Sequence, residues 1–117
     1  MRDPVEITLR GIPRSSALER YVGEQARALD RQCERIQACH VVAEALHRPK
    51  RQGAQFAVRL NITLPGTEVV VNREHGEDVY TALHHAFEAA SLQLEDHMRR
   101  QSQVERRSRN GKPSPGR

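Results

Sequence analysis

The 117-residue chain, 37% hydrophobic, has room for one domain with a small core, and no apolar run approaches the ~20 residues of a membrane span. Its net charge of +4 arises from residues 106–117, which hold five basic and no acidic side chains, so residues 1–105 do not form a strongly basic domain. Two cysteines, Cys33 and Cys39, and no secretory leader argue against a disulfide-rich secreted scaffold and favour a cytoplasmic protein with free thiols.

The first predicted elements are a strand and a helix. Val5, Ile7 and Leu9 alternate with polar residues, which is typical of a half-buried strand, and Gly11-Ile12-Pro13 ends it. Apolar residues then recur at steps of three and four, which predicts an amphipathic helix over residues 16–32. The segment Ser16-Ala17-Leu18-Glu19 fits a capping box at the start of that helix.

The middle of the chain predicts three more strands. Residues 36–46 are β-rich without a clean period, and residues 47–53 form a polar connector. Residues 56–64 alternate between apolar and polar side chains, and Val69-Val70-Val71 follows the turn at Pro65-Gly66. Together the last two runs predict an antiparallel hairpin with one buried and one wet face.

A second helix closes the predicted domain. Asp78 is a candidate N-cap, and the apolar stripe Val79, Leu83, Phe87, Ala90, Leu94 and Met98 continues to about residue 104. We expect residues 1–105 to form the domain and residues 106–117 to form a disordered basic tail. The order β-α-β-β-β-α predicts an α+β fold in which two helices pack on one face of a four-stranded sheet, as in double-stranded-RNA-binding domains.

No catalytic signature is present, and we expect a protein that is not an enzyme and binds no cofactor and no small-molecule substrate. His84, His85 and Glu88 lie close together on the second helix and could begin a metal site. A solvated helix face explains them more simply, so we predict no metal site.

Several motifs together resemble the ribosome hibernation-promoting factor family, also known as the sigma-factor modulation or ribosome-associated inhibitor family. They are Val5-Glu6-Ile7, Leu9-Arg10-Gly11, the Ser16–Val22 helix start, Gly53-x-x-Phe56, Leu64-Pro65-Gly66 and Glu77-Asp78-Val79-Tyr80-x-Ala82-Leu83. The resemblance covers about residues 4–100. The chain is similar to the short form of this bacterial-type family, which lacks an added C-terminal domain.

The resemblance implies binding to the small ribosomal subunit in the channel of messenger and transfer RNA, which silences idle ribosomes under stress by steric occlusion. The partner would be ribosomal RNA, reached through phosphate contacts. All but two of the 19 basic residues are arginine, which favours bidentate phosphate contacts. The candidate RNA-binding residues are Arg27, Arg31, Arg59, Arg73, Arg99, Arg100, Arg106 and Arg107.

The sequence departs from the family at the helical positions that usually carry basic side chains. These positions hold Gln25, Ala28, Arg31, Ala89, Leu92 and Asp96. Arg27, Arg99 and Arg100 lie about one helical turn from them, so a shifted basic surface is one expectation. The alternative is a diverged paralogue that serves as a protein–protein interaction module, for example through Leu92, and does not bind ribosomes. The oligomeric state stays open.

Overall fold

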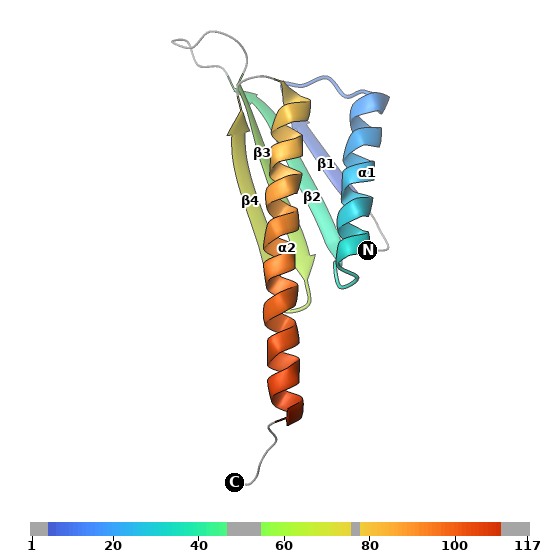
Figure 1. The fold of residues 1–117 in the computed structure, drawn as a ribbon. Coiled ribbons are helices and arrows are strands. Elements are labelled where there is room, and N and C mark those ends of the chain that lie inside the picture. The colour runs from blue at the N-terminus through green and yellow to red at the C-terminus, as the bar shows by residue number, and fades with distance from the viewer. Residues whose placement is uncertain (1–4, 47–54, 76–77, 111–117) are drawn as a thin grey trace.

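A computed structural model describes the backbone of residues 5–46, 55–75 and 78–110. It contains strand β1 (Val5–Arg10), helix α1 (Ser16–Gln32), strands β2 (Ala38–Leu46), β3 (Gln55–Leu64) and β4 (Thr67–His75), and helix α2 (Val79–Asn110). Both helices lie side by side on one face of the sheet (Figure 1). The predicted β-α-β-β-β-α fold is therefore confirmed.

The sheet has the strand order β1-β2-β3-β4. β1 and β2 run parallel and are connected through α1, whereas β2, β3 and β4 form an antiparallel meander. The predicted hairpin turn is present between Leu64 and Thr67, where Gly66 has a φ of +75° that only glycine adopts easily. This topology leaves β1 and β4 at the two edges of the sheet.

The core lies between the sheet and the helices. One face of the meander supplies several of its largest fully buried side chains, which include Val41, Val58, Leu60 and Ile62. The helices contribute the predicted apolar stripes, which are Leu18, Val22, Ala26 and Leu29 on α1 and Leu83, Ala86, Phe87, Ala90 and Leu94 on α2. Among the described residues no polar or charged side chain is buried, so the hydrophobic effect dominates the stability of this layer.

The N-terminal cap of α1 differs from the prediction by one residue. Ser15, in extended conformation, accepts a hydrogen bond from the Leu18 N–H at 3.1 Å. The predicted capping box at Ser16 is therefore wrong, because Glu19 lies one position too far along the helix and instead pairs with Arg14 at 2.5 Å. The cap of α2 is as predicted: the Thr81 N–H donates to Asp78 Oδ1 at 2.8 Å.

Helix α2 continues well past the predicted end near residue 104. It reaches Asn110, and its C-terminal part extends beyond the sheet (Figure 1). Gln, Glu and Arg between residues 101 and 109 are good helix formers, and the first glycine beyond them is Gly111. Residues 106–110 of the expected tail are thus part of α2, and residues 111–117 lie outside the described part of the chain.

Both cysteines are buried free thiols. Cys39 lies on the helix-covered face of β2, in line with Val41 and Ala43. Burial raises the pKa of the Cys39 thiol from its ordinary value of 9.0 to about 11.

Candidate nucleic-acid interface

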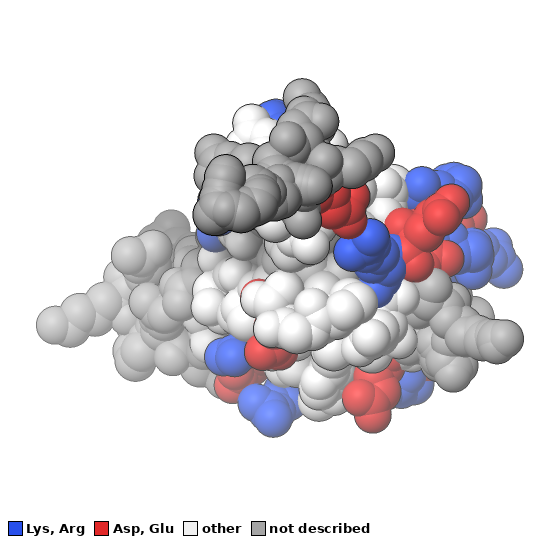
Figure 2. Space-filling model, turned by 90° about the horizontal axis from the view of Figure 1, so that it is seen from below, with Lys and Arg blue, Asp and Glu red and all other residues white. Residues whose placement is uncertain are grey.

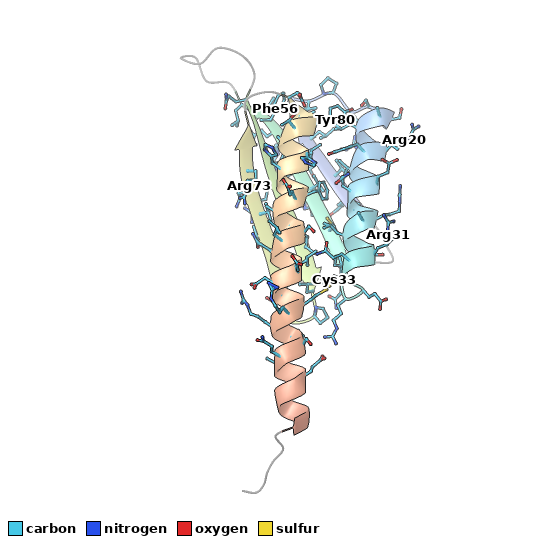
Figure 3. All side chains as sticks on the ribbon, viewed as in Figure 1. Arg20, Arg31, Cys33, Phe56, Arg73 and Tyr80 are labelled. Atoms are coloured by element: carbon cyan, nitrogen blue, oxygen red, sulfur yellow. The ribbon has the colours of Figure 1, made fainter. Side chains whose placement is uncertain are left out.

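The outer face of α1 carries the clearest row of cationic side chains. Arg20, Arg27 and Arg31 are exposed on the side opposite the buried stripe. Figure 3 shows Arg20 and Arg31 at the outer side of this helix. Within the described part of the chain, no carboxylate pairs with any of these three guanidinium groups. This row can therefore offer its charges to an external anion.

Arginines at the end of α2 are partly neutralised. Arg99 Nη2 lies 3.5 Å from Asp96 Oδ1, and Arg100 pairs with the other oxygen of the same carboxylate. Both pairs are exposed, so each contributes little to stability and can exchange for another anion. Arg106 and Arg107 belong to the last turns of α2, and their side chains lie outside the described part of the structure.

The predicted arginines of the sheet lie in different environments. Arg59 is on the open face, where its Nε donates to Asn61 Oδ1 at 2.9 Å, and the Asn61 amide in turn donates to Glu68 at 2.6 Å. Arg73 pairs with Val58 in the ladder, which places it on the helix side at the edge of the sheet. A shallow hollow of about 400 Å³ between them also contains Arg10 and Glu44. Because Glu6, Glu44 and Glu68 share the open face, its charge is mixed.

The groove between the two helices is almost uncharged. It has a volume of about 230 Å³ and is lined by Gln25 and Ala28 of α1 and by His84, Glu88 and Ser91 of α2, among others. Gln32 ties its walls together: its amide donates to the Ser91 carbonyl at 2.8 Å and accepts from the Ser91 hydroxyl at 2.8 Å. Two of the positions where the family resemblance leads us to expect basic side chains therefore line a groove whose described lining contains Glu88 and no Lys or Arg.

The described residues do not support a metal site at the second helix. The rings of His84 and His85 are 6.0 Å apart between centroids and tilted by 52°. No group of three His, Cys, Asp or Glu side chains within residues 5–46, 55–75 and 78–110 converges to hold an ion. The two histidines are exposed on α2.

Arg35, just after α1, is a basic residue that the sequence did not mark as functional. Arg35 follows α1 and donates from Nη2 to Glu105 Oε2 at 3.1 Å, which ties the extended part of α2 to the body of the domain. Arg31, Arg35 and Gln101 line a hollow of about 350 Å³ at this joint. No local pattern could have identified this contact, because it joins residues 70 positions apart.

The basic residues therefore occupy separate surfaces and do not form one patch. The α1 row, the α2 end and the sheet edge each carry a few. Viewed from the end where α2 extends, cationic and anionic side chains lie next to one another at the rim of the described surface, and its centre is uncharged (Figure 2). None of the described helices is long and apolar enough to span a membrane.

The fold is similar to that of two solved structures. One is a ribosomal subunit interface protein from Coxiella burnetii, with a TM-score of 0.68, 18% identity, and coverage of 80% of this chain and 96% of that chain. The other is the N-terminal domain of Protein Y from Thermus thermophilus, with a TM-score of 0.66, 22% identity, and coverage of 79% and 94% respectively. At these identities the likeness concerns the fold.

No curated protein sequence matches the chain significantly. A family model does match, and it spans residues 5–102, from the first strand to the extended part of α2. The matched region contains every strand, the whole of α1 and the packed part of α2. The chain therefore belongs to the sigma 54 modulation protein / S30EA ribosomal protein family.

Proposed function

We propose that this protein is a ribosome hibernation factor that binds the small ribosomal subunit and occludes the channel of messenger and transfer RNA. The observation that carries the proposal is family membership over residues 5–102. The similarity of its fold to a ribosomal subunit interface protein supports it. Occlusion requires shape and charge but no chemistry, so the protein acts in the cytoplasm as a binding factor and not as an enzyme.

The α1 row is the primary RNA contact of the proposal. Arg27 and Arg31 are one turn apart, exposed and without a carboxylate partner among the described residues, so no ion pair among those residues must break before they contact phosphates. Arg99, Arg100, Arg106 and Arg107 at the end of α2 form the second contact. Arg59 and Arg73 belong to the proposed surface as weaker members, because the sheet carries compensating acids.

Pelleting of the chain with small ribosomal subunits over a series of salt concentrations tests this proposal. Binding to RNA phosphates releases counterions, so affinity should fall steeply with salt. The double substitution Arg27→Gln/Arg31→Gln should weaken binding and reduce the slope of log K against log[salt] by about 0.7 to 0.9 for each lost phosphate contact. The same charge change on the open sheet face, Arg10→Gln/Arg59→Gln, serves as the matched control and should have the smaller effect.

A version that ends at Glu105 separates the two proposed contacts. It removes Arg106 and Arg107 but keeps the α1 row and the core. Weaker, still salt-dependent binding would agree with a folded anchor. Complete loss of binding would show that the folded domain is not the anchor, and no binding of the full chain at low salt would contradict the ribosomal role.

The protein-interaction alternative has one structural feature in its favour. Leu92 is 62% exposed, the highest value among the large hydrophobic side chains described, and the groove between the helices is nearly uncharged. A protein complex whose affinity does not depend on salt concentration, together with no ribosome binding, would favour this second function.

A further inference from the structure

Strand β4 presents an open row of backbone hydrogen-bonding groups. Among the described residues it pairs with β3 alone. The Thr63 carbonyl accepts from the Gln37 N–H at 2.8 Å, on the side of β2. The N–H and C=O of Thr63 therefore point toward β2 and away from its β4 partner Glu68. The N–H and C=O of Glu68 consequently point away from β3. By the alternation of an antiparallel ladder, Glu68, Val70 and Asn72 direct their N–H and C=O groups out of the sheet.

This edge has few of the features that usually block pairing. The ladder with β3 runs from Thr67 to His75 without a bulge, and the strand contains no proline. Its centre is the run Val69-Val70-Val71. One blocking feature is present: Arg73 Nη1 donates to the outward Asn72 carbonyl at 2.7 Å and so occupies one acceptor of the edge. Figure 3 shows Arg73 at the outer side of β4. Because this bond is exposed, its exchange for another costs little.

The flank of α2 beside β4 contains a second feature. Thr67, Val69, Leu92, Asp96 and Arg100 contribute to a hollow of about 460 Å³ between the helix and the start of the strand. Leu92 lies at this hollow and is largely exposed. Asp96 contributes a carboxylate that pairs with Arg99 and Arg100, so the hollow combines an apolar side chain with an exposed ion pair.

We propose that β4 is a self-association edge, at which two copies of the chain pair antiparallel about a twofold axis at Val70 and form a continuous eight-stranded sheet. In this register Val70 faces Val70, Val69 faces Val71, and Glu68 faces Asn72. The outward groups of Glu68, Val70 and Asn72 then all find partners. A twofold axis makes the same patch serve both copies.

Neighbouring registers are less favourable. A shift of the axis to Val69 places the Glu68 carboxylate opposite Val70. A shift to Val71 places the Arg73 guanidinium opposite the buried Val69 on the helix side. The Val70 register instead places Arg73 of the second copy opposite Thr67, at the hollow that holds Asp96. The interface thus acquires two symmetric Arg73–Asp96 charge contacts, for which each Arg73 gives up its bond to Asn72 and each Asp96 exchanges an exposed pair with Arg99 or Arg100.

The first test is analytical ultracentrifugation of the full chain over a range of concentrations. We expect a monomer–dimer equilibrium. Val70→Lys places two like charges face to face on the axis and should weaken dimerisation about tenfold or more, with an unchanged circular dichroism spectrum. Val42→Lys makes the same change at a half-buried valine of the same face on β2, away from the edge, and should leave the dimer intact. A monomeric chain at all concentrations, or equal effects of both substitutions, overturns the proposal.

Cross-linking tests the register independently. With a short thiol-to-thiol reagent, Val70→Cys should give a covalent dimer, because the two side chains meet at the axis. Thr63→Cys lies on β3, so its two copies are three strand spacings or about 14 Å apart at least, and it should not cross-link. A dimer that fails to cross-link through Val70→Cys, or that cross-links equally through Thr63→Cys, contradicts the pairing described here.

Discussion

Individual residues show how the chain fills its core without polar atoms. Cys39 takes a position between the sheet and the helices where an aliphatic side chain would also fit, and it does so as a neutral thiol. Gln32 and Ser91 complete their hydrogen bonds with each other at the rim, outside the apolar layer. Among the described residues, the titratable groups in the buried layer are thus the two thiols, Cys33 and Cys39.

The raised pKa of Cys39 predicts a loss of stability at high pH. In the unfolded chain the thiol ionises near pH 9.0, and in the folded chain near 11. Between these values the unfolded state binds fewer protons, so the free energy of unfolding should fall as pH rises, by about 2 to 3 kcal/mol in total. Denaturant unfolding at several pH values measures this.

Cys39→Ala provides the comparison. The substitution leaves a small cavity and should lower stability at every pH. It should also remove the part of the decline between pH 9 and 11 that belongs to the thiol. If the free energy of unfolding falls equally with pH in the unsubstituted chain and in Cys39→Ala, the thiol has the same pKa in the folded and the unfolded state.

At the level of elements, the sequence predicted types and order well and some ends poorly. The period-two and period-3.6 patterns identified β1, β3 and both helices, because each buries one face against the same core. The β-rich composition of residues 36–46 and 69–71 identified β2 and β4. The cap of α1 was misplaced because Ser15 and Ser16 are both good capping residues, and only the backbone angles decide between them. The end of α2 was misplaced because an exposed helix needs no apolar stripe when its residues favour helix.

The two serines make the corrected cap testable. Ser15→Ala removes the acceptor for the Leu18 N–H and should lower the free energy of unfolding by about 1 kcal/mol. Ser16→Ala changes the first helical residue and should leave stability unchanged or slightly improved, since alanine favours helix. Chemical denaturation of both variants gives the comparison, and the opposite ranking would restore the cap at Ser16.

At the level of the molecule, the family and the fold were accessible from sequence, but the arrangement of charge was not. The motifs lie on local patterns of strands, turns and helix starts, which the sequence displays directly. The placement of Arg35 against Glu105 and of Arg73 at the sheet edge depends on contacts across elements, whereas Arg99 and Arg100 pair with Asp96 within α2. Those contacts decide which arginines can bind an external anion.

The extension of α2 should act as a rigid arm for its arginines. Val104→Pro keeps every charge but interrupts the helix at an exposed position, at a local cost of about 3 kcal/mol. We expect lower helix content by circular dichroism, an intact core, and weaker ribosome binding than for the control Val104→Ala. Equal ribosome binding of the two variants would show that the arginines of the extension contribute to binding without a rigid helix.

The open edge of β4 also divides the amide protons of that strand into two populations. Those of Val69 and Val71 are held in the ladder with β3, whereas those of Glu68, Val70 and Asn72 point to solvent. Exchange with deuterated water should therefore alternate between slow and fast from one residue to the next. Any strand that docks at this edge would slow the exchange of the Glu68, Val70 and Asn72 amides and leave that of Val69 and Val71 unchanged. Slower exchange of the first set would therefore report that the edge is occupied.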